Sequence, residues 1–474
     1  MIIRNIGHDC AYHIEKIAVM FFPLEKLRTD GDDNVVITTL KQNNILFVRV
    51  KAYSKCIERN CDVSENDDIA NKLSLLLYDT LAELTGYSMP WGILYGVRPA
   101  RLMHSTVDKY GIDEARQKFL HDRVNNDKIT LALSVMQKEN EIIALSKRNS
   151  FSLYVSIPFC PSRCSYCSFV SHSIAKAKDL IEPYVQLLCK EIEIAGKTAK
   201  DLSLNLESIY FGGGTPTTLN ENQLERILKA VEDNFDLSNL REYTVEAGRP
   251  DTVNRAKLDT LLCHNVSRIS INPQTFSDEV LRNIGRKHTV KQTEDAYNLA
   301  RQMGFNNINM DFIAGLSGDT YTSFKNSIDK VVDFAPQSIT VHNLSLKSGA
   351  YLCTENEFFD LSSRNLTSDM IDYSFKVLTQ NGYNPYYMYR QSKSLGNLEN
   401  VGYSKPGFEC LYNVFMMDET HTVIAVGAGA VTKLKNYDTS HISRIYNYKY
   451  PYEYINNFDE VINRKQGIID FYNA

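Results

Sequence analysis

Residues 154–167 read YVSIPFCPSRCSYC, a strand-like apolar run that leads directly into three closely spaced cysteines. This run is the first of six in the middle of the chain, and the later ones include SIYF, YTVE, RISI, NINMDF and SITV. Amphipathic segments of helical length separate the runs, and such alternation predicts parallel strand–helix–strand units. We therefore expect an α/β fold, a partial (β/α)6 barrel whose loops at the carboxyl ends of the strands line the site.

The alternation divides the chain into three sections. Residues 149–346 form the predicted barrel, which follows a polar boundary at residues 146–150. Residues 1–148 mix strand-like and helical stretches and predict an N-terminal α+β accessory domain. Residues 347–474 lose the alternation and predict a C-terminal α+β domain that covers the substrate.

Four segments of the outer sections carry clear local signals. Residues 34–50 predict a β-hairpin, because two β-rich runs flank a polar turn. Apolar residues recur with helical periodicity in residues 67–85, 128–146 and 363–380. We therefore expect one hairpin and three helices outside the barrel.

The overall composition excludes several classes of protein. A net charge of −5 over 474 residues does not indicate a nucleic-acid binder. The first residues carry charges throughout, unlike a signal peptide, and no apolar run approaches the roughly 18 residues that span a bilayer. We expect a cytoplasmic monomer with no nucleic-acid or membrane partner. In that reducing compartment disulfides are not expected, so a tight cysteine group indicates a metal site.

The cysteine group has an unusual composition for a metal site. Cys160, Cys164 and Cys167 are separated by three and then two residues. A structural zinc site needs four protein ligands, and no further Cys or His stands at zinc-finger spacing, although His172 is near. Three thiolates on one loop instead suit an iron–sulfur cubane with one iron left open for chemistry. A zinc site or unrelated buried cysteines are the alternatives.

A glycine-rich segment follows the second apolar run. Phe211 is followed by Gly212, Gly213 and Gly214, then by Thr215. Consecutive glycines allow close approach of the backbone to a ligand and positive φ angles, although a plain tight turn would use them too.

The cysteine spacing resembles that of the radical S-adenosylmethionine superfamily. In that family a [4Fe–4S] cluster binds S-adenosylmethionine at its open iron and generates a 5′-deoxyadenosyl radical. The motifs YVSIPFCPSRCSYCSF, YFGGGTPT, VEAGRP, INPQTF, GRKH and NMDFIAGL occur in that order. Together they resemble the oxygen-independent coproporphyrinogen III oxidase (coproporphyrinogen dehydrogenase) family. WGILYGVRPARL and LGNLENVGYSKPGFECLYN resemble its HemZ branch, which extends the likeness over the whole chain.

The resemblance implies roles for single residues, beginning with Cys160, Cys164 and Cys167 as the catalytic cluster ligands. It places Tyr154 near the sulfonium and Tyr166 against the adenine. The expected cofactor-binding residues around them, on the glycine segment and after the later strands, are Gly213, Gly214, Thr215, Glu246, Gln274, Arg286 and Asp311.

The family pattern assigns these last residues more closely. Gly213, Gly214, Thr215 and Glu246 meet the methionyl amino group, Gln274 and Arg286 contact the ribose and the methionyl carboxylate, and Asp311 binds the ribose hydroxyls. An arginine is the natural partner of a carboxylate. Alternatively, Glu246 and Asp311 cap the next helices and Arg286 is a solvated surface residue.

The implied reaction is anaerobic oxidative decarboxylation in haem biosynthesis. Two propionates of coproporphyrinogen III would become vinyl groups, giving protoporphyrinogen IX, with an electron donor such as flavodoxin or ferredoxin. Two departures weaken this reading: Ser156 stands where the family has a histidine, and Phe169 where it has a fourth cysteine. An aromatic residue at position 169 resembles the haem-chaperone relatives. A haem chaperone, and a radical methyltransferase or haem-ring-opening enzyme, are the alternatives.

A tetrapyrrole with four propionates requires cations and flat apolar walls. Arginine binds carboxylates in a bidentate manner, and tyrosine rings stack on planar ligands. Surface exposure of the cations and core packing of the tyrosines are the alternatives. His342 is expected to be a loop or core histidine, and the glycines of residues 427–430 lack the full spacing of a dinucleotide site. The substrate candidates are Arg98, Arg101, Arg163, Arg249, Arg390, Lys405, Tyr386, Tyr387 and Tyr389.

Overall fold

A computed structural model describes residues 1–23, 25–28, 30–167, 172–345, 361–391, 394–439 and 441–473. The chain forms two compact units. The smaller unit contains residues 1–136, 353–369 and 388–399, and the larger one contains residues 137–352, 370–387 and 400–474. These boundaries differ from the three predicted sections, because short segments of the last section pack with the N-terminal residues.

The smaller unit is built on a four-stranded sheet in the order β1-β2-β3-β4. β1 is parallel to β2, and the other neighbours are antiparallel. One face alternates with buried Ile37, Val48 and Val50, so apolar side chains point to the core. The strands span Ile2–Ile6, Val35–Gln42, Ile45–Ala52 and Lys55–Asp62.

The helices described for the smaller unit include α1 (Ala11–Phe21), α2 (Ile69–Thr85), α3 (Pro99–Tyr110) and α4 (Ile112–His121). The boundary between the two units falls within α5 (Asn126–Ile143). α2 packs on β3 and β4. Its first turn is fixed by the Asp68 side chain, which accepts the Asn71 N–H, and it ends at Gly86 in the left-handed conformation. The predicted hairpin and both N-terminal helices are confirmed.

The larger unit contains the predicted barrel strands. Six parallel strands lie in the order β12-β11-β10-β9-β8-β5, which confirms the strand–helix alternation. They are β5 (Ser150–Ile157), β8 (Asn205–Gly213), β9 (Glu242–Glu246), β10 (Arg268–Ser270), β11 (Ile308–Ala314) and β12 (Ser338–Asn343).

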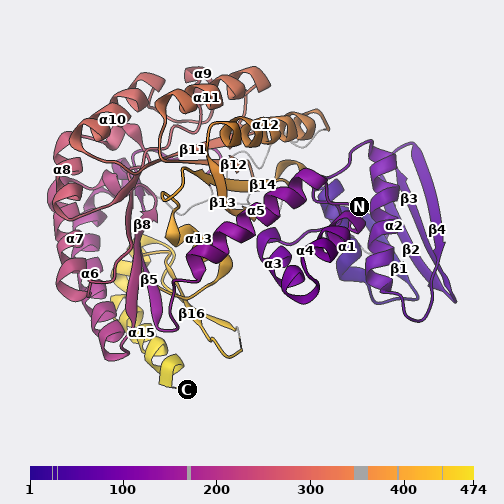
Figure 1. Ribbon diagram of the computed structural model, residues 1–474, viewed down its shortest axis with the longest axis horizontal. Coiled ribbons are helices and arrows are strands. Elements are labelled where there is room, and N and C mark those ends of the chain that lie inside the picture. The colour runs from indigo at the N-terminus through magenta and orange to yellow at the C-terminus, as the bar shows by residue number, and fades with distance from the viewer. Residues whose placement is uncertain are drawn as a thin grey trace. The chain divides into compact units, whose positions relative to one another are not determined.

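Helices lie along the outer side of this sheet, as Figure 1 shows. α7 illustrates why they form: Asn220 and Gln223 make a capping box, and Leu224, Ile227 and Leu228 form its buried stripe. The helices are α6 (Ile174–Asp201), α7 (Glu221–Asn234), α8 (Arg255–Cys263), α9 (Asp278–Asn283), α10 (Val290–Met303) and α11 (Tyr321–Phe334).

The C-terminal section does not stand apart from this sheet. β14 (Glu399–Ser404) pairs antiparallel with β12 at one edge, and β15 (Thr422–Val426) pairs parallel with β5 at the other. Among the described residues, this sheet has eleven strands. Further elements include α12 (Leu361–Gln380), β13 (Asn384–Arg390), α13 (Leu411–Asp418), β16 (Val431–Lys435), β17 (Ile442–Tyr446), α14 (Pro451–Asn456) and α15 (Phe458–Asn473).

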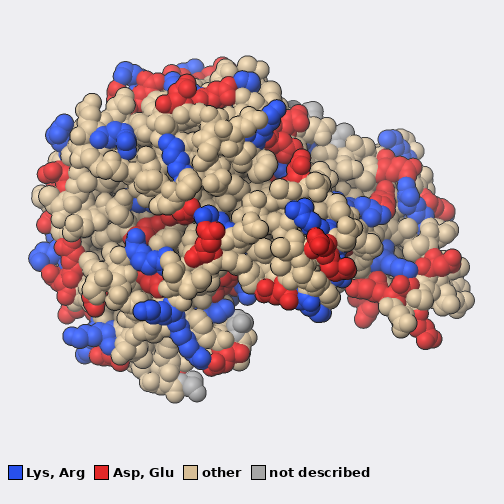
Figure 2. Space-filling view, viewed as in Figure 1, with Lys and Arg blue, Asp and Glu red and all other residues tan. Residues whose placement is uncertain are grey.

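The surface carries charges of both signs. On the face drawn in Figure 2, acidic and basic side chains are interspersed among other residues. Among the residues that the structure describes, no helix combines the length and the apolar character needed to cross a membrane.

Candidate functional site

The cysteine loop (residues 158–167) leaves the carboxyl end of β5 and is held at three points. Pro158 accepts the N–H of His172 at 2.9 Å, and Cys164 accepts that of Cys167 at 3.2 Å. The Ser165 N–H donates to the Ile284 carbonyl at 3.0 Å, which ties the loop to the GRKH segment. Cys164 is buried, and Cys160 and Cys167 are partly accessible. The loop therefore presents three thiols from one short segment.

The residue type and the spacing of these thiols suit an iron–sulfur cluster. In the described part of the chain, no three His, Cys, Asp or Glu side chains converge on one point that could hold a metal ion. A cubane does not require this convergence, because each cysteine binds its own iron. The donor set, three thiols on one loop, matches the chemistry of iron–sulfur ligation.

The glycine segment (residues 212–215) lies against the cysteine loop. Gly214 donates to the Ile157 carbonyl at 2.7 Å, and Thr215 donates to that of Phe159 at 2.8 Å. The Thr215 hydroxyl is 3.5 Å from the Cys160 sulfur. A Cβ on Gly214 would lie 2.5 Å from the Phe159 oxygen, so this close approach requires glycine. The structure thus brings two of the predicted motifs together.

Glu246 lies at the end of β9 and is bonded to the neighbouring strand. The Tyr210 hydroxyl donates to its carboxylate at 2.6 Å. Tyr210 stacks at 4.6 Å on Tyr412, whose ring is also stacked against Tyr154 at 5.9 Å. Three tyrosines therefore form one wall beside the carboxylate, and Tyr412 comes from the C-terminal section.

The protein encloses Glu246 closely enough to perturb its acidity. Desolvation raises the pKa of this carboxyl, and the nearby Asp311 raises it further, whereas the Tyr210 hydrogen bond lowers it. The net result is a pKa of about 7. A carboxyl that titrates near neutrality in a partly accessible position is typical of functional sites.

Asp311 lies on β11, two strands from Glu246. Its carboxylate accepts the Asn309 amide at 2.7 Å and lies 3.7 Å from the His342 ring on β12. Desolvation opposes ionisation, but hydrogen bonds from His342, Asn309 and Thr340 outweigh it and lower the pKa of Asp311. The neighbouring helices α8 and α11 are capped by Asn254 and Thr320. The alternative role of these acids as helix caps is therefore excluded.

Gln274 and Arg286 carry buried polar atoms with no partner. Gln274 has a φ of 69°, and its backbone exchanges hydrogen bonds with Asp311 and Ile313. The Arg286 guanidinium donates to the Asn272 carbonyl at 2.6 Å and is 8% exposed, so it is not a solvated surface residue. The Gln274 side-chain oxygen and the Arg286 Nε have no hydrogen-bond partner. Such atoms cost free energy unless a ligand satisfies them.

Arg286 also bonds the cysteine loop. Desolvation alone would lower its pKa, but the adjacent Tyr166 and Cys164 raise the pKa of this guanidinium overall. Tyr166 is thus held between the cysteines and Arg286. The structure places all of the predicted cofactor residues in the larger unit, within the parallel strands or in the segments that connect them.

The sequence reasoning missed Tyr210 and Tyr412 and underestimated His342. Tyr210 and His342 had a sequence signal, since each continues a row of alternating polar residues along its strand. Tyr412 lies in the C-terminal section and had no such signal. On the polar face of the barrel strands, Asn309 accepts hydrogen bonds from Ser338 and Thr340 on the adjacent strand. The polar residues of that face include Ser152, Ser156, Ser208, Tyr210, Thr244, Glu246, Arg268, Ser270, Asn309, Asp311, Ser338, Thr340 and His342.

The cationic residues predicted to bind the substrate are divided between the two units. Arg98 and Arg101 lie at the start of α3, in the smaller unit. Arg390 also belongs to that unit; it is 3% exposed, lies over the Trp91 ring and donates to the Leu94 carbonyl.

Three cations remain in the larger unit. Arg249 donates two hydrogen bonds to Asp251 and one to Ser162, so it braces the cysteine loop. Lys405 donates to the Ala335 carbonyl. Arg163 is exposed on the cysteine loop itself.

The tyrosine candidates are largely core residues. Tyr386 and Tyr387 are 0% and 4% exposed, which supports core packing rather than stacking on a ligand. Tyr389 is partly accessible. Phe169, the departure that favours a chaperone, lies outside the described residues.

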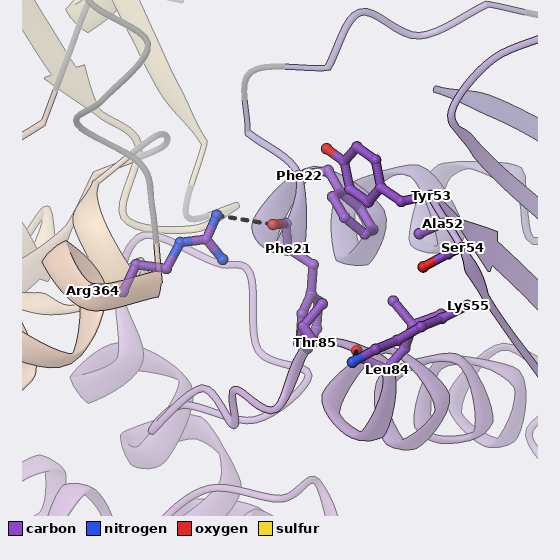
Figure 3. Close-up of a pocket in the computed structure, with 9 residues that line it drawn as sticks. All are labelled: Phe21, Phe22, Ala52, Tyr53, Ser54, Lys55, Leu84, Thr85 and Arg364. Carbon is purple, nitrogen blue, oxygen red and sulfur yellow. Dashed lines mark hydrogen bonds between the residues drawn. The ribbon is translucent and has the colours of Figure 1, made fainter.

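The smaller unit contains a cavity of about 340 Å³, shown in Figure 3. Arg364 donates to the Phe21 carbonyl at its rim. None of the predicted site residues lines it; the lining residues are Phe21, Phe22, Ala52, Tyr53, Ser54, Lys55, Leu84, Thr85 and Arg364.

Comparison with known proteins identifies the family. Residues 154–331 match the radical SAM superfamily. The oxygen-independent coproporphyrinogen-III oxidase-like protein HemZ of Bacillus subtilis strain 168 is 36% identical over 412 residues. That alignment covers 85% of this chain and 82% of the relative. The chain belongs to the HemZ family of radical SAM proteins.

Other relatives of this HemZ-family chain include a heme chaperone and a coproporphyrinogen III oxidase. The heme chaperone HemW of Lactococcus lactis subsp. lactis is 31% identical over 306 residues, covering 64% of this chain and 74% of that protein. The solved structure of coproporphyrinogen III oxidase (HemN) from Escherichia coli, a radical SAM enzyme, has a TM-score of 0.52 at 22% identity. It covers 68% of this chain and 71% of that one, which confirms the fold. As a radical SAM protein, the chain binds a [4Fe–4S] cluster and S-adenosylmethionine.

Proposed function

We propose that this protein decarboxylates two propionate side chains of coproporphyrinogen III to vinyl groups, giving protoporphyrinogen IX without oxygen. The observation that carries the proposal is the near full-length likeness to the coproporphyrinogen-III oxidase-like protein HemZ. The site supports it, because three thiols lie beside a sheet face that carries unsatisfied polar atoms.

The cofactor residues take the following roles in this proposal. Cys160, Cys164 and Cys167 hold the cluster. Glu246, Gly213, Gly214 and Thr215 receive the methionyl ammonium, for which an ionised carboxylate is the natural partner.

The remaining groups orient the nucleoside end and the carboxylate of the cofactor. Arg286 and Gln274 offer the unpartnered Nε and side-chain oxygen to the methionyl carboxylate and the ribose. Asp311 accepts from the ribose hydroxyls, and His342 holds its carboxylate in place. Tyr154 lies near the sulfonium, and Tyr166 packs on the adenine.

The protein itself positions the substrate and excludes water. When bound, the reduced cluster and S-adenosylmethionine supply a strong hydrogen-atom abstractor. Arg163 is exposed on the cysteine loop, where a propionate must approach, and a guanidinium binds a carboxylate in a bidentate manner. We expect Arg163 to hold the propionate so that its β-carbon faces the cofactor.

The electron count of the reaction requires two partners. Each decarboxylation would consume one electron, which a donor such as flavodoxin or ferredoxin would supply by way of the bound cluster. Loss of CO₂ from the substrate radical then releases one electron to an acceptor. The products are one vinyl group, one CO₂, 5′-deoxyadenosine and methionine.

An anaerobic assay with the reconstituted protein tests the proposal. S-adenosylmethionine, a reductant, an electron acceptor and coproporphyrinogen III are supplied, and products are analysed by mass spectrometry. We expect loss of two CO₂ per tetrapyrrole with matching 5′-deoxyadenosine. In Arg163→Gln we expect 5′-deoxyadenosine formation to continue while decarboxylation falls. Formation of 5′-deoxyadenosine by the unaltered protein without any decarboxylation would overturn the substrate assignment.

Haem delivery is the second candidate function. It is favoured by the 31% identity to a heme chaperone HemW and by Phe169 at the position of the fourth cysteine. It predicts stoichiometric haem binding and transfer to an apo-haemoprotein with no decarboxylated product. Titration with haem, followed by absorbance, distinguishes the two functions.

A further inference from the structure

A second glycine loop (residues 427–430, GAGA) follows the strand that pairs with β5. This loop has no role in the proposed reaction. It follows β15, which pairs with β5 in parallel up to Val426 and Val155. The pairing delivers the loop to the last residues of β5. The first cluster ligand, Cys160, lies only four residues beyond Ser156.

A buried carboxylate fixes this second glycine loop. Glu191 of α6 is 0% exposed, accepts three hydrogen bonds and forms an ion pair with Lys465. The Gly427 N–H and the Tyr454 hydroxyl each donate to one oxygen at 2.7 Å. Asn447 donates to the other oxygen at 2.7 Å, and the Lys465 ammonium lies 2.9 Å from that same oxygen. Lys465 of α15 is itself 2% exposed and also donates to the Ala425 carbonyl at 2.6 Å.

The side chains of Ser156 on β5 and Tyr184 on α6 connect the second glycine loop to β5. The Ser156 hydroxyl donates to the Ala428 carbonyl at 2.7 Å. The Tyr184 hydroxyl donates to the Ser156 carbonyl at 2.8 Å and accepts the Ala428 N–H at 2.9 Å. Both the backbone and the side chain of Ser156 are thus anchored to the C-terminal section.

Ser156 also borders the glycine segment that faces the cofactor. A Cβ on Gly213 would lie 3.1 Å from the Ser156 hydroxyl, and a Cβ on Gly427 would lie 2.6 Å from the Ser156 carbonyl. Ser156 therefore lies between the glycine segment and the second glycine loop.

We propose that Glu191, Lys465 and Ser156 are positioning residues, through which the C-terminal section sets the cysteine loop and the cofactor-facing glycine segment in register. The chain of contacts runs from α15 to the second glycine loop, then to Ser156 and on to Ile157, whose carbonyl accepts the Gly214 N–H. The proposal concerns the cofactors rather than the tetrapyrrole. It therefore stands whichever reaction the protein catalyses.

Two variants test the proposal on the reconstituted full-length protein. Ser156→Ala removes one hydrogen bond without creating a large void, and Glu191→Gln leaves donors around the buried side chain without an acceptor. The measurements are iron content, the dissociation constant for S-adenosylmethionine and the EPR spectrum of the reduced cluster with and without S-adenosylmethionine. We expect affinity to fall about fivefold to tenfold in Ser156→Ala, as loss of one hydrogen bond predicts, with an altered spectrum.

Matched controls separate positioning from a general loss of stability. Ser152→Ala lies on the same strand and face, where its hydroxyl bonds Ser208 and His421. Glu207→Gln removes a buried carboxylate at the amino-terminal half of β8, where it pairs with Arg241. Both controls should keep the unaltered affinity and spectrum even where their melting temperatures fall.

Two results would overturn the proposal. One is an unchanged affinity and spectrum in Ser156→Ala. The other is an equal change in Ser152→Ala at equal melting temperature. If Glu191→Gln fails to fold, Ser156→Ala alone decides the outcome.

Discussion

Two sheets in this molecule bury their faces with opposite chemistry. In the smaller unit, the buried face of β2 and β3 is apolar, with Ile37, Val48 and Val50 fully buried. In the larger unit, Thr244, Ser270 and Thr340 are almost as deeply buried, yet all are polar. Burying polar groups is costly unless hydrogen bonds compensate. The first face therefore stabilises the fold through apolar burial, whereas the second depends on hydrogen bonds and carries Glu246 and Asp311, which we propose bind the cofactor.

The largest expected effect on stability comes from the apolar face. Ile37→Ala should lower the free energy of unfolding of the smaller unit by about 2–5 kcal/mol, because it removes buried methyl groups and leaves a cavity. The affinity for S-adenosylmethionine should not change, since Ile37 belongs to the other unit. Calorimetry and equilibrium dialysis measure the two quantities. A matching loss of affinity would show that the two faces do not divide their roles.

The opposite result is expected for the polar face. Asp311→Asn keeps the size of the side chain but removes the charge, so S-adenosylmethionine should bind about 10- to 100-fold more weakly, the range for a hydrogen bond to a charged group. The melting temperature should change little. Asp319→Asn, a buried acid in the loop after the same strand, is the control and should bind normally. Equal losses in both variants would contradict the assignment of Asp311.

The acidity of Glu246 predicts how binding depends on pH. Because its pKa is about 7, the ionised form that receives an ammonium is depleted in acid. Affinity should therefore rise about tenfold per pH unit below pH 7 and level off above it. Dissociation constants measured from about pH 5.5 to 8.5 check this. In Glu246→Gln the affinity should no longer depend on pH in this range. If the pH dependence kept its slope, a group other than Glu246 would be responsible for it.

The raised pKa of Glu246 affects the stability of the cofactor-free protein in the opposite direction, because stability falls as the pH rises. The folded, cofactor-free protein holds this proton more tightly than the unfolded chain, whose carboxyl has the ordinary value of 4.5. The contribution of Glu246 to stability is therefore present at low pH and is lost as the pH rises from 4.5 to about 7. S-adenosylmethionine and low pH thus favour different protonation states of one residue.

The smallest expected effect concerns the tyrosine beside Glu246. In the unaltered protein, the 2.6 Å hydrogen bond from Tyr210 lowers the pKa of Glu246. Tyr210→Phe removes this bond, so the pKa of Glu246 should rise. The midpoint of the binding profile should move up by about half to one pH unit, as loss of one hydrogen bond predicts. Tyr243→Phe is the matched control, because the Tyr243 hydroxyl on the next strand is buried without a partner. A shift in the control but not in Tyr210→Phe would contradict this coupling.

Local sequence signals were enough to predict much of the architecture. The six barrel strands follow from apolar runs of strand length, and the hairpin at residues 34–50 follows from two such runs around a polar turn. The cysteine loop is also local, because its three thiols lie within eight residues. By contrast, the strands of the C-terminal section were not predicted to join the barrel sheet.

The contacts between distant segments were beyond these local signals. Tyr412 stacks on Tyr210, 202 positions away in sequence, and no periodicity marks that pair. Arg249 was predicted to bind a propionate, but its guanidinium is held by Asp251. Arg390 packs on Trp91, almost 300 residues away. Such partners depend on how strands align, which single-residue properties do not specify.

The sequence by itself determined the strand–helix order and the family and predicted the cluster ligands, because these depend on spacing along the chain. Only the tertiary structure decided which polar residues share one face of the barrel sheet. It also decided the raised pKa of Glu246 and the hydrogen bond between Ser156 and the second glycine loop. These properties arise from desolvation and from hydrogen bonds between segments far apart in sequence. They exist only once the sheet has brought those segments together.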